Sequence, residues 1–143
     1  MESKEQPIKF SLKQIRTHQF AIIDDSYLDK EKISLSSSLH FGSDKENKVI
    51  GVFASFKFET KKQPFLIIEV RCFFQIEDKD WDSLFDSKSN TVQIPKGFIT
   101  HLAMLTVGTT RGVLHAKTES TPFNRYILPP INITEFIKED ISL

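Results

Sequence analysis

The stretch PFLIIEVRCFFQI, residues 64 to 76, decides the fold that the sequence predicts. Read with the two-residue period of a β-strand, one side of it is an unbroken apolar row made of Leu66, Ile68, Val70, Cys72, Phe74 and Ile76. The other side should be polar, but it consists of Phe65, Ile67, Glu69, Arg71, Phe73 and Gln75. Half of this second row is large and apolar, with a charge pair in the middle. We therefore expect one face of the strand to cover a core. The other face should either be covered by another part of the protein or serve as a contact surface.

Three segments upstream also have strand patterns. In residues 8–23 the apolar alternation loses its phase near Ile15, which predicts a long strand with a bulge or bend. Residues 33–41 and 48–59 alternate more regularly. Short polar connections join the four strands, which favours a four-stranded antiparallel meander in sequence order.

A polar crossover segment follows at residues 77–93. Within it, Trp81, Leu84 and Phe85 have the i, i+3, i+4 spacing of one side of a helix. This spacing predicts either a helical turn or a segment that folds back as a lid over apolar surface.

The last third of the chain is expected to be helical. A long helix is predicted from about Pro95 to Lys117, with an apolar stripe of Phe98, Ile99, Leu102, Leu105 and Val113. A short helix is predicted from Ile133 to Lys138, after Asn132 as N-cap. The fold class is therefore α+β, in a single domain of residues 1–143 with a flexible tail at residues 1–7.

The long helix also carries a row of mostly small residues, Met104, Gly108, Gly112 and Ala116. Each glycine inside a helix costs about 1 kcal/mol relative to alanine. The row indicates either a weak or kinked helix, or a groove in which another backbone packs closely.

The composition excludes several classes of protein. Nineteen basic residues balance 19 acidic ones, so no overall positive field would draw the chain to nucleic acid or anionic lipid. No apolar run approaches the roughly 18 residues of a membrane span, and the first residues, MESKEQPIKF, lack the apolar core of a signal peptide. Cys72 is the only cysteine, which excludes an internal disulfide and fits a reducing compartment. We expect a soluble cytoplasmic protein.

No catalytic or metal-binding motif is recognised. The four histidines, His18, His40, His101 and His115, form no i, i+4 pair and have no companion cysteines, so neither a metal site nor a cofactor is predicted. Phosphate-loop and nucleophile-elbow patterns are absent from the sequence as well. The chain is therefore predicted not to be an enzyme. The alternative is an enzyme or small-molecule-binding protein whose candidate residues are Glu69, Arg71, His101 and His115.

Three motifs occur in a specific order: FLIIEVRCFF at 65–74, VQIPKGFITHLAMLTVGTTRG at 92–112 and ILPPINITEFI at 127–137. Together they resemble the fourth strand, the first helix with its entry, and the lead into the last helix of the SecB family of export chaperones. The resemblance extends nearly from end to end of the chain. The family is typically strongly acidic, whereas this chain is neutral and has basic residues on or beside the sheet, namely Lys57, Lys61, Lys62 and Arg71. The chain therefore looks like a divergent member, a group that includes chaperones of toxin–antitoxin pairs.

The resemblance implies an assembly and a partner. SecB-like protomers pair through strands and the long helix, and two dimers sandwich their helices between two sheets, so a homotetramer is implied. The interface residues would then be Ile68, Val70 and Cys72 of the strand, with Met104, Gly108, Gly112 and Ala116 of the helix. By the same resemblance, Glu69 and Arg71 would dock a protein partner, either the secretion ATPase or an antitoxin.

The implied function is that of a holdase chaperone, which binds unfolded or precursor polypeptides without ATP. Such binding needs broad apolar contact, which contributes about 25 cal/mol per Å² whatever the client sequence. The candidate groove residues are Phe53, Phe65, Ile67, Phe73, Trp81 and Phe85. Alternatively, the same residues pack under the helices of their own or a partner protomer, or the chain is a scaffold for one dedicated partner.

Overall fold

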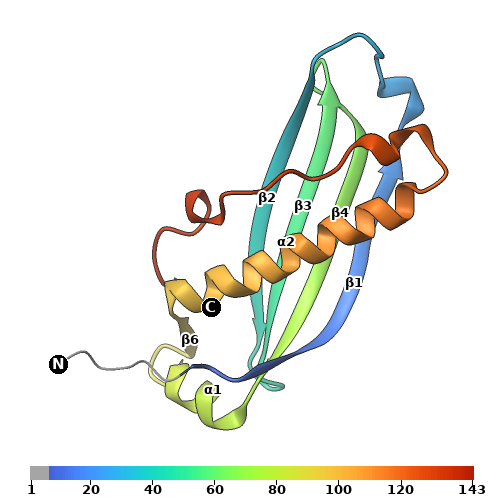
Figure 1. The fold of residues 1–143 in the computed structure, drawn as a ribbon. Helices are drawn as coiled ribbons and strands as arrows, with labels where there is room; N and C mark the ends of the chain where they lie inside the picture. The colour runs from blue at the N-terminus through green and yellow to red at the C-terminus, as the bar shows by residue number, and fades with distance from the viewer. Residues whose placement is uncertain (1–6) are drawn as a thin grey trace.

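The computed structural model describes residues 7–143. One long helix crosses one face of a large antiparallel sheet, and a small second sheet lies at one end (Figure 1). The strands of the large sheet are β1 (Phe10–Ile22), β2 (Ile33–Asp44), β3 (Val49–Thr60) and β4 (Gln63–Ile76). This arrangement confirms the α+β class. The tail predicted for residues 1–7 lies, apart from Pro7, outside the described residues.

The strand order is β1-β4-β3-β2 rather than a four-stranded meander. Consecutive hairpins join β2, β3 and β4 as expected, but β1 pairs with β4 at the opposite edge from β2. The predicted position of the first strand is therefore wrong. Alternation indicates which side chains share a face, not which strand lies alongside. The connection at residues 23–32 is long enough to cross three strand spacings, about 14 Å.

The long helix is α2 (Lys96–Thr118), which has Pro95 as its N-cap and agrees with the prediction to within about one residue. It runs without interruption through Gly108 and Gly112. Its buried side chains, which pack on β4 and β3, include Ile99, Leu102, Val107 and Leu114. Buried threonine hydroxyls on the same side donate to the carbonyl four residues earlier: Thr106, Thr110 and Thr118. The helix therefore buries polar side chains without leaving them unpaired.

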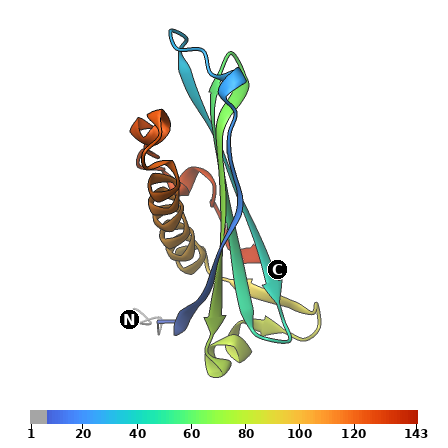
Figure 2. The same cartoon turned by 90° about the vertical axis from the view of Figure 1, so that its right-hand side faces the viewer.

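Only one face of the large sheet is covered by α2 (Figure 2). In residues 7–143 no helix lies over the opposite face, which we call the open face. The side chains of β3 and β4 on the helix side form the core, as the unbroken apolar row predicted.

The predicted irregularity in the first strand is confirmed. The pairing of β1 with β4 shifts twice, which leaves Lys13 and His18 as the extra residues of two bulges. Leu12, Ile15 and Phe20 therefore all oppose buried residues of β4, although the steps from Leu12 to Ile15 and from Ile15 to Phe20 are odd and would change face in a regular strand. The bulges keep the helix side of β1 mostly apolar, with Thr17, opposite Val70, as the exception.

A third pairing shift turns Phe65 toward the helix side of the sheet. The pairing of β3 with β4 changes register at this point, which makes Phe65 the extra residue of a bulge. Its ring is fully buried and its centroid lies 4.9 Å from that of Tyr27 and 5.2 Å from that of Tyr126. The prediction that Phe65 belongs to the second row is wrong, because strict alternation fails at a bulge.

The crossover segment contains α1 (Asp78–Leu84), β5 (Phe85–Asp86) and β6 (Thr91–Ile94). The expected helical turn is confirmed. The end of the chain returns as β7 (Ile141–Ser142) and pairs with β6, which completes a small sheet in the order β5-β6-β7. This sheet was not predicted, since β5 and β7 have only two residues each and β6 only four, too few to show a clear alternation.

The predicted short helix near the end of the chain is wrong. Only a single 3-10 turn forms, at Ile133–Glu135, and the side chain of Asn132 caps it by accepting a backbone hydrogen bond. Upstream, the Arg111 guanidinium fixes the proline segment by donating to the carbonyls of Leu128 and Pro129 at 2.7 and 2.9 Å.

Candidate functional site

A cleft opens on the helix side, between the start of β1 and the first turns of α2. Its volume is about 390 Å³, and its lining consists of Pro7, Ile8, Phe10, Pro95, Gly97, Phe98 and His101. The ring of Phe10 packs edge-to-face against Phe98 and His101, at centroid distances of 5.5 and 5.9 Å. The cleft is therefore mainly apolar and aromatic, with His101 as its one titratable side chain.

Exposed apolar side chains continue from this cleft along β1 and α2. Leu12 and Ile15 are 45% and 48% exposed, and their pairing with β4 places them on the helix side. On α2, Leu105 is 40% exposed and follows His101 by about one turn, on the same side of the helix. We define the β1–α2 surface as Phe10, Leu12, Ile15, Phe98 and Leu105. Single exposed apolar residues are ordinary, whereas a patch of several is typical of a binding surface.

The outer side of α2 carries the predicted row of small residues. Met104 is 59% exposed, and Gly108, Gly112 and Ala116 are exposed as well. A Cβ atom added at Gly108 or Gly112 would meet no other atom within 4 Å. None of the described residues fills this space, so another backbone has room to approach the helix closely.

The β4 residues that were expected at a subunit interface lie in the core of the protomer, not on its surface. Ile68, Val70 and Cys72 are fully buried beneath α2, because the helix covers the apolar row of β4. Direct contact of these three residues with a second chain is therefore excluded in this structure. Burial raises the pKa of the Cys72 thiol, against the smaller lowering effects of hydrogen bonds with Thr106 and Thr109.

Two of the predicted groove residues, Phe53 and Phe73, lie together on the open face, with ring centroids 6.1 Å apart. Phe53 lies against the backbone of Gly51, where a Cβ atom would come within 2.9 Å of its ring. Ile67 is on the same face but only 7% exposed. The two phenylalanines therefore form a small, partly exposed patch rather than one wall of a long groove.

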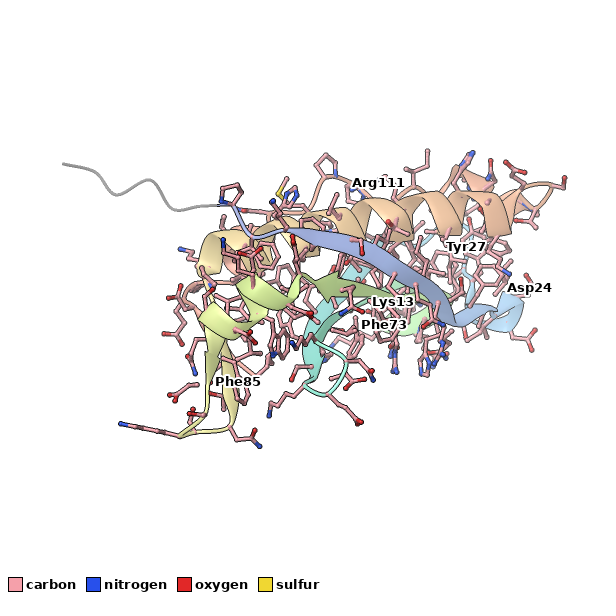
Figure 3. All side chains as sticks on the ribbon, turned by 90° about the horizontal axis from the view of Figure 1, so that it is seen from below. Lys13, Asp24, Tyr27, Phe73, Phe85 and Arg111 are labelled. Carbon is pink, nitrogen blue, oxygen red and sulfur yellow. The ribbon has the colours of Figure 1, made fainter. Side chains whose placement is uncertain are left out.

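The other three predicted groove residues are dispersed. Phe65 is buried on the helix side, and Trp81 is 3% exposed because the short helix α1 turns it into the core. Phe85 is half-buried in the small sheet, on a different part of the fold from Phe73 (Figure 3). The prediction that these residues and the two open-face phenylalanines line one groove is wrong.

The charge pair of the second row lies on the open face. Arg71 Nε donates to Glu69 Oε2 at 2.9 Å, and His18 Nε2 lies 3.7 Å from the same oxygen. The guanidinium carbon of Arg71 is 4.7 Å from the centroid of Phe53. Across the β1–β4 pair, Arg16 lies directly opposite Arg71. This side of the sheet is therefore polar and aromatic, in contrast to the β1–α2 surface.

The residues of the enzyme alternative do not converge. Glu69 and Arg71 lie on the open face, whereas His101 and His115 belong to α2 on the other side of the sheet. Within residues 7–143, no group of three His, Cys, Asp or Glu side chains is placed to hold a metal ion. In the same part of the chain, none of the helices has the length and apolarity needed to cross a membrane.

Sequence reasoning missed Leu12 and Ile15 as exposed residues and placed Leu105 in the buried stripe of the helix. A signal for Leu105 was present, because the apolar residues of α2 extend around more of the helix than one sheet can cover. The sequence offered no such signal for Leu12 and Ile15. They are exposed because β1 is an edge strand, and the alternation of apolar residues does not show the order of the strands.

No protein-family model matches the chain, and no curated protein matches it. Among solved structures, the chain is similar to the SecB-like chaperone Rv1957 of Mycobacterium tuberculosis, solved in complex with a ChAD peptide from the HigA1 antitoxin Rv1956. The two chains are 9% identical, with a TM-score of 0.47, over 86% of this chain and 91% of that chain.

Proposed function

We propose that the chain is a holdase chaperone that binds unfolded polypeptide segments on the β1–α2 surface without ATP. The observation that supports this best is the exposure of Leu12, Ile15 and Leu105, each at least 40% exposed beside an aromatic cleft. The proposal places this activity in the cytoplasm, with export precursors or aggregation-prone proteins as clients.

Two properties of the surface suit a client of any sequence. Apolar contact contributes about 25 cal/mol per Å² without selecting particular side chains, and Phe10 and Phe98 supply such area with few rotatable bonds to fix. In addition, β1 is an edge strand that pairs only with β4 in the described part of the chain. An extended client can therefore add hydrogen bonds to the backbone of β1, which do not depend on the client's sequence.

We propose further that the protein is a homotetramer in which α2 helices of different protomers pack through the row Met104, Gly108, Gly112 and Ala116. The support is the open space over the two glycines, which allows a close approach of two helices.

Suppression of aggregation tests the proposed function. A reduced, chemically unfolded client is diluted into buffer, and light scattering should rise more slowly when the protein is present. The double variant Leu12→Gln, Ile15→Gln should lose most of this suppression, because it removes apolar area from the β1–α2 surface. The matched control is Ile127→Gln, which changes a side chain that is 57% exposed outside this surface and should suppress like the wild type.

The outcomes separate the candidate functions. Lack of suppression with several unrelated clients would refute the chaperone function, and equal suppression by the double variant would refute the placement of the site. Saturable binding of one folded or unfolded protein, such as an antitoxin, with no effect on other clients would instead support a dedicated scaffold.

A further inference from the structure

Arg16 and Arg71 are direct partners in the antiparallel pairing of β1 with β4. Directly opposed residues of such a pair point to the same face, so both guanidinium groups belong to the open face. Two like charges in opposed positions repel each other and destabilise a sheet. The strand pairing alone therefore does not favour two arginines at these opposed positions.

Aromatic rings hold the two guanidinium groups in place without neutralising them. The guanidinium carbon of Arg71 lies 4.7 Å from the ring centroid of Phe53, and that of Arg16 lies 5.9 Å from the ring centroid of Phe73. Such cation–π contacts are made through the flat face of the guanidinium, which leaves its edge N–H groups able to donate, as Arg71 Nε does to Glu69 Oε2.

The nearest carboxylate, that of Glu69, is already engaged. It accepts a hydrogen bond from Arg71 at 2.9 Å, it lies 3.7 Å from His18, and its side chain is 19% exposed. In the described part of the chain, no ion pair joins Arg16 to any residue. Lys13, the other bulge residue of β1, also lies on the side of the sheet away from α2 (Figure 3). Hydrogen bonds lower the pKa of Asp44 most, and Lys13 is close enough to help lower it, so the charges of Lys13 and Asp44 offset each other. The local excess of positive charge comes from Arg16 and Arg71 against the single carboxylate of Glu69, although the whole chain is neutral.

A partner that carries carboxylates fits this arrangement. The planar donor fork of arginine matches the two oxygens of a carboxylate, and the Phe53–Phe73 pair offers an apolar contact beside the two arginines. A nucleic acid fits less well, because it is bound through many phosphates along an extended basic tract. This chain has no net charge, and the carboxylate of Glu69 lies within the site.

We propose that Arg16 and Arg71 on the open face bind an acidic segment of a partner protein, with its carboxylates on the two guanidinium groups and an apolar side chain against Phe53 and Phe73. The site lies on the opposite side of the sheet from the β1–α2 surface. It goes beyond the proposed chaperone function and does not depend on it.

The experiment is a fluorescence-anisotropy titration with a labelled peptide of alternating glutamate, leucine and phenylalanine. The same peptide with glutamine in place of every glutamate is the first control, and a labelled oligothymidylate of similar length is the second. The proteins are the wild type, Arg16→Gln, and the matched charge variant Lys88→Gln in the exposed β5–β6 turn. The variant Leu12→Gln, Ile15→Gln is included because a holdase could also bind the peptide through the β1–α2 surface.

The wild type should bind the glutamate peptide at least about tenfold more tightly than the glutamine peptide, and Arg16→Gln should weaken this binding by about tenfold. Lys88→Gln and the double variant should bind like the wild type. Circular dichroism should show Arg16→Gln folded, with a melting temperature no lower than that of the wild type, since one of two opposed charges is gone. Equal affinity for the two peptides, or unchanged affinity in Arg16→Gln, would overturn the proposal. Tighter binding of the oligothymidylate would overturn it in favour of a nucleic acid.

Discussion

The hydroxyl groups of Tyr27 and Tyr126 lie 2.7 Å apart and share a hydrogen bond, although the residues are 99 positions apart in the sequence. The guanidinium of Arg125 donates to both hydroxyls. The two rings pack edge-to-face with each other and with Phe65, and Phe123 joins the same cluster. This cluster ties the β1–β2 connection to the segment after α2, and so fixes the end of the helix to the sheet.

The stability of the protein should depend on the ionisation of Tyr27. The hydrogen bond with Tyr126 and, to a lesser extent, burial raise the pKa of Tyr27. The folded state therefore holds this proton more tightly than the unfolded chain does. The resulting stabilisation is complete below the usual tyrosine pKa of about 10 and is lost as the pH rises above it. The free energy of unfolding, from urea titrations, should fall above about pH 10 by less in Tyr27→Phe than in the wild type. Identical pH dependence in the two proteins would contradict this.

Phe65→Ala should be among the most destabilising single substitutions. The ring is fully buried and has four aromatic neighbours, so its removal leaves a cavity that the surrounding rings cannot close. The expected loss in the free energy of unfolding is about 3–5 kcal/mol, measured by urea denaturation. Phe136→Ala, at a ring that is 39% exposed, serves as the control and should lose much less. Similar losses in the two variants would show that the bulge at Phe65 does not bury its ring as described.

Gly112→Leu should dissociate the proposed tetramer without unfolding the protomer. Within one chain an added Cβ atom meets nothing, so helix content by circular dichroism should be unchanged. Across a close contact between helices, the leucine side chain would hold the two backbones apart. Multi-angle light scattering should therefore give a lower mass than for the wild type. Lys117→Leu adds the same side chain at an exposed position outside the row and should keep the wild-type mass; a Gly112→Leu protein of wild-type mass would exclude this row as the interface.

Cys72 should react with a disulfide reagent such as DTNB only when the protein opens. The side chain is fully buried, and burial raises the pKa of the thiol, so the reactive thiolate is rare in the folded state. The absorbance change should be slow in native buffer and should reach one thiol per chain rapidly in urea. Rapid, complete reaction in native buffer would mean that α2 does not stay packed on β4.

The local patterns of the sequence were sufficient to predict which face of β4 is buried and where the helix that covers it begins. The even-numbered residues of β4 from Leu66 to Ile76 are all buried, and Pro95 marks the start of the helix that covers them, as predicted. Both features depend only on near neighbours in the chain. The phase slip near Ile15 likewise predicted a bulge in β1, because an extra residue disrupts the two-residue period wherever it occurs.

The remaining features depend on contacts between distant parts of the chain. Glu69 and Arg71 were visible as an anomaly in an otherwise apolar strand, but Arg16 joins them only because β1 lies beside β4. Phe65 left its predicted face because the hairpin shifts register one residue after Pro64. The strand order leaves no trace in the alternation of a single strand. The apolar run from Phe65 to Ile68 also hides the period that a bulge would otherwise disrupt. The position of Arg16 beside Arg71 and the aromatic cluster around Phe65 therefore required the structure.

The two bulges of β1 also affect how readily other strands can add to this edge. A straight edge strand next to exposed apolar side chains is a template for cross-β fibrils, in which flat strands stack without limit. A strand that bends at Lys13 and again at His18 offers only short straight runs, so an incoming flat strand loses its register after a few hydrogen bonds. The irregular strand therefore disfavours open-ended stacking of flat strands, while its backbone groups stay available to a short extended segment.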